Sequence, residues 1–222
     1  MRIARLPPSR RVWIFDLDNT LHDAKAKIFP SMHDQINDYL KRHFGVDQAG
    51  ADAMRQKFWA TYGTTMNGLM RHHGTDPRHF LRETHVFPEL ADMVIRENAL
   101  KHALDRLDGR KIIFSNAPRH YVDEVLRGLR LQRYFDAVYT IEDARFVGKP
   151  ALHGFRLLLR NHHLDPHRCA FVDDMLENLR TARRLGMSTV WVSPARRRVP
   201  FVDLRVTSVT QLPRLVFRYG AE

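Results

Sequence analysis

Two aspartates, two residues apart, follow a short apolar run near the start of the chain. The run Val12–Phe15 leads directly into the sequence Asp-Leu-Asp-Asn-Thr, which contains Asp16 and Asp18. In such a pair one carboxylate can attack phosphorus, while the other handles the proton of the leaving group. The pair is therefore a candidate for hydrolytic chemistry on a phosphate ester, although loops can produce so short a match by chance.

Three further polar clusters come at the ends of later apolar runs or connections. In chain order they are Ser115 with Asn116, then Lys149, then Asp173 with Asp174. Any one of these clusters on its own is most often ordinary loop chemistry. Their order along the chain, each at the end of a predicted strand or connection, is what predicts one shared site.

The grouping of these residue types predicts a metal ion and a bound phosphate. Four carboxylates brought close together repel one another unless a cation lies among them. Oxygen ligands suit Mg²⁺, which takes one or two carboxylates together with substrate phosphate and water. Lys149, Ser115 and the Asn116 amide would hold the phosphate oxygens, where the transition state needs charge stabilisation. The predicted metal candidates are Asp16, Asp18, Asp173 and Asp174.

The elements that must position these side chains are alternating strands and helices. Helical patterns at 120–129 and 176–185 separate continuous apolar runs, which are typical of parallel strands covered on both faces. Pro150 is expected at the first position of a further helix. This alternation predicts an α/β fold with a doubly wound parallel sheet, in which ligands bind beyond the carboxyl ends of the strands. The predicted strands are 12–15, 112–114, 137–140, 170–172 and 189–192.

One long interval interrupts the alternation. Asp16 and Ser115 are 115 − 16 = 99 positions apart, whereas 34 positions separate Ser115 from Lys149. A βαβ unit takes roughly 30 residues, so about 70 residues are in excess here. Stretches 28–44, 49–62 and 77–85 within the excess have helical patterning. We therefore expect a core domain of residues 1–21 and 94–222, with a helical cap domain of residues 22–93 packed over the strand ends.

The four clusters in this order resemble the motifs of the haloacid dehalogenase-like phosphatases, across essentially the whole chain. The resemblance implies that Asp16 is the nucleophile and forms an aspartyl-phosphate. It implies that Asp18 is the general acid and then the base, and that its backbone carbonyl binds the metal. It also implies Mg²⁺ ligation by Asp16 and Asp174, with Asp173 acting through water or Lys149. Asn178 stands where some members have aspartate.

The position of the insertion resembles the helical-cap subclass, and the segment 62–69 resembles the pyrimidine 5′-nucleotidase group. That resemblance makes Tyr62, Asn67 and Arg71 candidates for substrate contact. A tyrosine can stack on a base, and an asparagine can hydrogen-bond its edge. A helix junction broken by glycine explains the same segment equally well. The expected function is that of a phosphomonoesterase acting on a small phosphorylated metabolite. The first candidate for the substrate is a pyrimidine nucleoside 5′-monophosphate.

The composition restricts the setting of this chemistry. The chain has 36 basic and 25 acidic residues and a net charge of +11, but the basic residues are scattered, so nucleic acid is not an expected partner. One cysteine excludes an intramolecular disulfide, and no apolar stretch is long enough for a membrane span. We expect a cytoplasmic protein.

The thirteen histidines include adjacent pairs but no His-Glu-x-x-His spacing, so the sequence contains no indication of a zinc site.

Three other functions stay open at this point. The first is a phosphatase of the same family that acts on a sugar phosphate or another small metabolite. The second is a haloacid dehalogenase, against which Asp18 and Asp174 argue, because the dehalogenases of the family lack the second aspartate and the metal. The third is a nucleic-acid-binding protein that retains a phosphatase-like fold.

Overall fold

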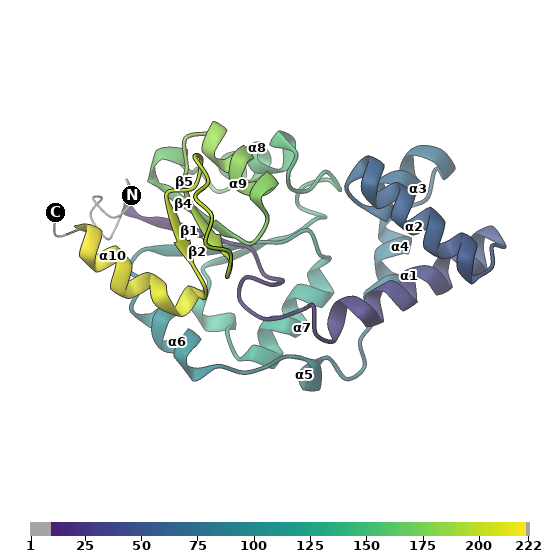
Figure 1. Cartoon of the computed structure of the whole chain (residues 1–222), viewed down its shortest axis with the longest axis horizontal. Helices are drawn as coiled ribbons and strands as arrows, with labels where there is room; N and C mark the ends of the chain where they lie inside the picture. The colour runs from purple at the N-terminus through teal and green to yellow at the C-terminus, as the bar shows by residue number, and fades with distance from the viewer. Residues whose placement is uncertain (1–9, 221–222) are drawn as a thin grey trace. The chain divides into compact units, whose positions relative to one another are not determined.

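A computed structural model describes residues 10–220 of the 222-residue chain (Figure 1). The chain divides into two compact units. The residues up to Asp23 and those from Val94 onward form one, here called the core unit. Ala24–Met93 form the other, here called the helical unit.

A six-stranded parallel sheet is the centre of the core unit. Its strands are β1 (Val12–Phe15), β2 (Arg110–Phe114), β3 (Ala137–Tyr139), β4 (Cys169–Asp173), β5 (Ser188–Val192) and β6 (Leu204–Val206). They lie in the order β3-β2-β1-β4-β5-β6, and every neighbouring pair is parallel. The five strands predicted from apolar runs are present, and the doubly wound parallel sheet is confirmed. Strand β1 lies between β2 and β4, so the residues after these three strands emerge side by side.

Helices cover both faces of this sheet. Figure 1 shows α8 and α9 on one side, and α6, α7 and α10 on the other. Their bounds are α6 (Asn98–Asp105), α7 (Arg119–Leu129), α8 (Leu152–Asn161), α9 (Leu176–Arg184) and α10 (Leu212–Gly220). On the first face, Phe155 of α8 meets Phe114 and Phe171 of the sheet, with ring centroids 5.1 Å apart in both pairs. This buried aromatic packing fixes the strands that end at the polar clusters.

The helical unit contains α1 (Ile28–Phe44), α2 (Gln48–Tyr62), α3 (Thr65–His73), α4 (Pro77–Thr84) and α5 (Leu90–Met93). Local sequence signals set several of these boundaries. The carboxylates of Asp47 and Asp76 accept backbone N–H groups at the starts of α2 and α4, as helix N-caps do. Gly63 ends α2 in the left-handed conformation with φ 78°, which glycine adopts without steric strain.

Two details differ from the sequence-based expectations. Helix α8 begins at Leu152, so Pro150 precedes the helix and is not its first residue. The glycine break after α2 is followed by a separate helix, α3, which was not among the three helical stretches expected in this interval. Among the residues that the structure describes, no helix is long and apolar enough to cross a membrane.

Candidate active site

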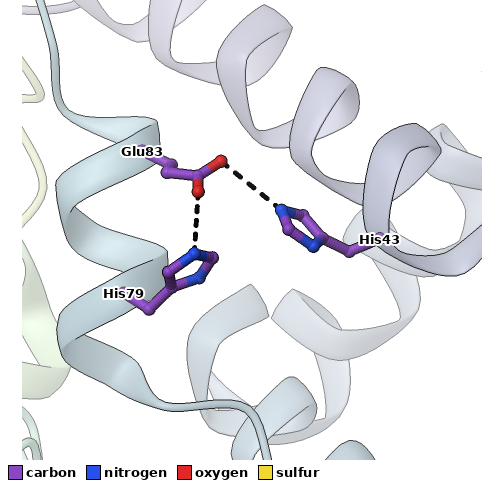
Figure 2. A group of neighbouring side chains, drawn as sticks. All are labelled: His43, His79 and Glu83. Atoms are coloured by element: carbon purple, nitrogen blue, oxygen red, sulfur yellow. Dashed lines mark hydrogen bonds and ion pairs between the residues drawn. The ribbon is translucent and has the colours of Figure 1, made fainter.

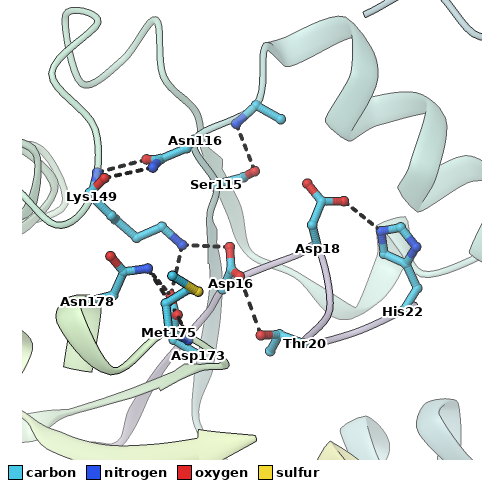
Figure 3. Close-up of polar contacts among 11 residues, drawn as sticks. Asp16, Asp18, Thr20, His22, Ser115, Asn116, Lys149, Asp173, Met175 and Asn178 are labelled. Carbon is cyan, nitrogen blue, oxygen red and sulfur yellow. Dashed lines mark hydrogen bonds and ion pairs between the residues drawn. The ribbon is translucent and has the colours of Figure 1, made fainter. Parts of the chain in front are cut away.

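The carboxyl ends of the three central strands bring the polar clusters together (Figure 3). Asp16 directly follows β1, Ser115 follows β2, and Asp173 is the last residue of β4. The backbone hydrogen bonds between neighbouring strands continue as far as the site. The N–H of Asp16 donates to the Val172 carbonyl at 2.9 Å, and the N–H of Ser115 donates to the Tyr139 carbonyl at 3.0 Å. The parallel sheet therefore holds these three positions on rigid backbone.

Lys149 links two of the carboxylates. Its Nζ donates to Asp16 Oδ1 at 2.6 Å and to Asp173 Oδ2 at 3.0 Å. Burial disfavours the ammonium, but the charges of Asp16 and Asp173 outweigh burial and raise the pKa of Lys149. The rings of Phe114 and Phe171 lie 5.3 and 5.5 Å from Nζ and exclude water on that side. Lys149 is thus a fixed positive charge next to Asp16.

The side chain of Asn116 holds the backbone of Lys149. Its Oδ1 accepts the Lys149 N–H at 2.8 Å, and its Nδ2 donates to the Lys149 carbonyl, also at 2.8 Å. Gly148 lets the two segments approach, because a Cβ there would lie 2.2 Å from Asn116 Oδ1. The amide that the sequence assigned to phosphate is therefore engaged with the lysine loop. Asn116 positions Lys149, and phosphate contact by Asn116 remains a prediction.

Asp173 is held from several directions. Its Oδ1 accepts the Met175 N–H at 2.7 Å, and the Asn178 amide donates to both of its oxygens at 3.0 Å. Burial, opposed by Lys149 and reinforced by the charge of Asp16, raises the pKa of Asp173 to about 7. Burial also raises the pKa of Asp16, although Lys149 opposes it. The two buried carboxylates share one ammonium. When both are ionised, the positive charge of Lys149 therefore neutralises only one of their two negative charges.

Asp18 has two partners that were not among the predicted site residues. The Tyr121 hydroxyl donates to Asp18 Oδ1 at 2.6 Å, and His22 Nε2 lies 2.9 Å from the same oxygen. Burial, and then the charge of Asp18, raise the pKa of Tyr121 well above its usual value, so the hydroxyl stays a donor. Tyr121 is 103 residues away in sequence and faces the site from α7. His22 follows Asp18 by four residues, and that spacing was the one available signal.

The donor atoms fit a magnesium ion. Asp16, Asp173 and Asp174 each offer a carboxylate oxygen, and these oxygens lie within 4.8 Å of one another. The set contains no nitrogen or sulfur, which favours Mg²⁺ over zinc. Burial is the main reason that the pKa values of Asp16 and Asp173 are raised, and a bound cation would oppose this effect by favouring both charged forms.

The three residues predicted to contact substrate from the cap have local partners in the helical unit. Asn67 Nδ2 donates to the Tyr62 carbonyl at 3.1 Å, and the Thr64 hydroxyl accepts the Asn67 N–H. The Tyr62 hydroxyl lies 2.5 Å from His72 Nε2, and the Arg71 guanidinium is 5.6 Å from the Tyr62 ring centre. These contacts show that Asn67 helps to close the α2–α3 junction. Substrate contact by Tyr62, Asn67 and Arg71 remains a prediction.

Comparison with known proteins places the chain in a family. The model of the haloacid dehalogenase-like hydrolases matches residues 11–186. Phosphate metabolism protein 8 of Saccharomyces cerevisiae is 24% identical over 200 residues, which are 82% of this chain and 61% of that protein. The chain therefore spans less than two thirds of the length of this relative.

Two solved structures show the breadth of the fold. The chain resembles a HAD phosphatase from Thermococcus onnurineus with a TM-score of 0.67 and 19% identity, over 93% of this chain and 97% of that one. It resembles the L-2-haloacid dehalogenase of Xanthobacter autotrophicus with a TM-score of 0.60 and 18% identity, over 93% and 98% of the two chains. At these identities the likeness concerns the fold, which both activities share. With the family model matching most of its length, the chain belongs to the haloacid dehalogenase-like hydrolase family.

Proposed function

We propose that this hydrolase is a magnesium-dependent phosphomonoesterase that works through an aspartyl-phosphate on Asp16. The observation that carries the proposal is the pairing of two differently placed aspartates. Asp16 lies against the buried ammonium of Lys149, while Asp18 lies apart from it, bonded to Tyr121 and His22. The Lys149 ammonium opposes the effect of burial and favours the ionised, nucleophilic form of Asp16. The surroundings of Asp18 suit a group that exchanges a proton with the leaving alcohol.

The chemistry takes two steps. A carboxylate oxygen of Asp16 attacks phosphorus, the bond from phosphorus to the ester oxygen breaks, and the leaving alcohol takes a proton from Asp18. Water then attacks the phosphorus of the aspartyl-phosphate and gives its proton to Asp18, which releases phosphate and restores both groups. Tyr121 and His22 both contact Oδ1 of Asp18, so Oδ2 is the oxygen assigned to carry the proton.

The remaining residues bind and orient the phosphate. Lys149 supplies a positive charge beside Asp16, and Ser115, buried at the end of β2, would donate its hydroxyl to a phosphate oxygen. Asp16, Asp174 and the Asp18 carbonyl would hold Mg²⁺, with Asp173 beside them. When bound, Mg²⁺ would neutralise charge on the transferred phosphoryl group.

The proposed substrate is a small phosphorylated metabolite, with a pyrimidine nucleoside 5′-monophosphate as the first candidate. The support is the resemblance of the segment 62–69 to the pyrimidine 5′-nucleotidases, with Tyr62, Asn67 and Arg71 as the recognition residues. The helical unit would act as the cap that selects the substrate. A sugar phosphate is the alternative within the same chemistry. The single, buried cysteine supports a reducing compartment such as the cytoplasm.

The test is phosphate release by the purified chain with Mg²⁺ over nucleoside monophosphates and sugar phosphates. We expect Asp16→Asn to lower kcat by at least about 1,000-fold, since it removes the nucleophile. Asp203→Asn, which changes a carboxylate paired with Arg183 elsewhere in the core unit, is the matched control. No phosphate release from any ester with Mg²⁺, or full activity of Asp16→Asn, would contradict the proposal. Metal-independent halide release from a 2-chloro acid would identify a dehalogenase instead.

The substrate class needs a separate comparison. We expect Tyr62→Ala to raise KM for the preferred nucleotide and to leave hydrolysis of a minimal aryl phosphate unchanged. Equal losses on both compounds would show that Tyr62 supports the helical unit and does not recognise the base.

A further inference from the structure

Two histidines and a glutamate from separate helices meet in the helical unit (Figure 2). His43 lies in the last turn of α1, and His79 and Glu83 lie one turn apart on α4. His43 Nε2 is 3.4 Å from Glu83 Oε2, and His79 Nε2 is 2.8 Å from Glu83 Oε1. Both imidazoles therefore present the same nitrogen to one carboxylate.

The spacing of these atoms is close to that of a transition-metal site. One ligand atom from each of the three residues lies within 4.8 Å of the other two. In a tetrahedral zinc site with bonds of about 2.0–2.2 Å, ligand atoms are separated by about 3.4 Å. The distance from His43 Nε2 to Glu83 Oε2 equals that value, and the distance from His79 Nε2 to Glu83 Oε1 is shorter by 0.6 Å. Small side-chain rotations would therefore complete the geometry. Two histidines and one carboxylate are an established ligand set for zinc, with a fourth position left for water.

The surroundings fix the histidine rings. The hydroxyl of the buried Tyr39 lies 3.2 Å from His79 Nδ1, on the side of the ring away from Glu83. A histidine that ligates through Nε2 characteristically donates its Nδ1–H to a neighbouring oxygen, and Tyr39 provides one. The ring of His43 packs on Tyr39 with centroids 4.2 Å apart, and meets His79 edge-on at 5.3 Å. The rings are thus largely ordered before a metal arrives.

We propose that His43, His79 and Glu83 bind a divalent transition metal of the zinc class and thereby join α1 to α4. Arg42 is the group that the metal displaces, because its Nη2 forms an ion pair with Glu83 Oε2 at 2.9 Å. The Arg42 side chain is 58% exposed, so it can turn into solvent. An exposed ion pair of this kind contributes little stability, and its loss is a small penalty against three metal–ligand bonds.

This site is distinct from the magnesium site of the core unit in both composition and place. The core cluster has oxygen ligands alone, whereas this one has two imidazole nitrogens, which favour zinc, copper or nickel. No local sequence pattern indicates this site, because His43 is 36 positions before His79 and only the packing of α1 against α4 brings them together.

The test uses the full chain, stripped of metal and then kept in excess Mg²⁺ so that the oxygen-ligand site is filled. Zinc binding is measured by calorimetry, and Co²⁺ is titrated in parallel because its visible absorption reports tetrahedral nitrogen ligation. We expect one equivalent of Zn²⁺ to bind in the micromolar range or tighter. His43→Gln and His79→Gln should each weaken that binding by roughly 100-fold, since each removes one of three protein ligands.

Controls separate this site from the other histidines and from the phosphatase chemistry. His153→Gln changes an exposed histidine on α8 and should bind zinc as the unaltered chain does. Asp16→Asn should also bind zinc normally, so the result does not depend on the proposed activity. Circular dichroism of the metal-free variants checks that they fold, and Zn²⁺ should raise the Tm of the unaltered chain but not that of His79→Gln. Two results would overturn the proposal. One is that His43→Gln and His79→Gln bind zinc as tightly as the two control variants do, and the other is that the unaltered chain shows no saturable binding.

Discussion

At the scale of single residues, the setting of Asp18 is the feature that separates its role from that of Asp16. Tyr121 donates to Asp18 Oδ1 at 2.6 Å from a buried position, and it stays protonated over the working pH range. A hydrogen bond of this strength fixes the rotamer of the carboxyl group. The other carboxylate oxygen can then face the leaving group.

Tyr121→Phe removes that donor and keeps the ring. Because a hydrogen bond to a charged group contributes about 1.5–3 kcal/mol, we expect kcat to fall by roughly 10- to 100-fold. KM should change little, since the hydroxyl contacts Asp18 and not the phosphate. The measurement is steady-state hydrolysis of an aryl phosphate. Tyr134→Phe, which loses a hydroxyl bonded to Arg133, is the matched control. A kcat within two-fold of the unaltered chain would show that Asp18 does not need this partner.

Asn116 gives a second prediction, because it holds Lys149 by both backbone groups. Asn116→Ala leaves the ammonium in the chain but releases the loop that aims it. We expect kcat/KM to fall by roughly 10-fold or more, in keeping with the loss of precise positioning of a charged group. Asn161→Ala, at an exposed position at the end of α8, serves as the control. If phosphate contact were the only role of residue 116, made through its backbone N–H, the alanine variant would retain full activity.

At the scale of elements, the close packing of α2 against α3 depends on one glycine. A Cβ on Gly68 would lie 2.2 Å from Phe58 Cγ, which is buried in the helical unit. Gly68→Ala therefore sets two effects of opposite sign against each other. Helix propensity favours alanine by about 1 kcal/mol, whereas overpacking a core typically destabilises by about 1–3 kcal/mol.

We expect overpacking to dominate, because Phe58 cannot retreat without moving α2. Urea denaturation of Gly68→Ala should then show a lower free energy of unfolding than the unaltered chain. Full-length protein is used, with circular dichroism as the signal. An increase in stability would mean that the two helices separate easily, and that their contact contributes little.

The elements also show which features the sequence could predict. Buried parallel strands are continuous apolar runs, so five of the six strands and the positions after them could be located from hydropathy alone. Strand β6 was missed because Arg205 interrupts a strand of three residues. The contacts of Tyr121 with Asp18 and of Asn116 with Lys149 were missed for another reason. Tyr121 and Asn116 act across 103 and 33 positions of sequence, distances that no local pattern spans.

At the scale of the whole molecule, the charge balance of the core site links stability to metal and to pH. Burial raises the pKa of Asp173 to about 7 from an ordinary value of 3.8. The folded chain therefore binds more protons than the unfolded chain between about pH 4 and 7. By linkage, this group's contribution to stability is present below pH 4 and is lost as the pH rises towards 7.

A magnesium ion should restore the stability that is lost when Asp173 ionises, since the ion favours the charged carboxylates. We expect Mg²⁺ to raise Tm by several degrees near pH 7.5, because an ion at about 100 times its Kd stabilises by about 2.7 kcal/mol. Near pH 5 the increase should be smaller, because Mg²⁺ must then displace the proton on Asp173. Calorimetric scans with Mg²⁺ or with EDTA at matched ionic strength give both values. Asp173→Asn cannot ionise at this position and should reduce the difference between the two pH values. If Mg²⁺ raised the Tm of the unaltered chain equally at both pH values, metal binding would not depend on the ionisation of Asp173.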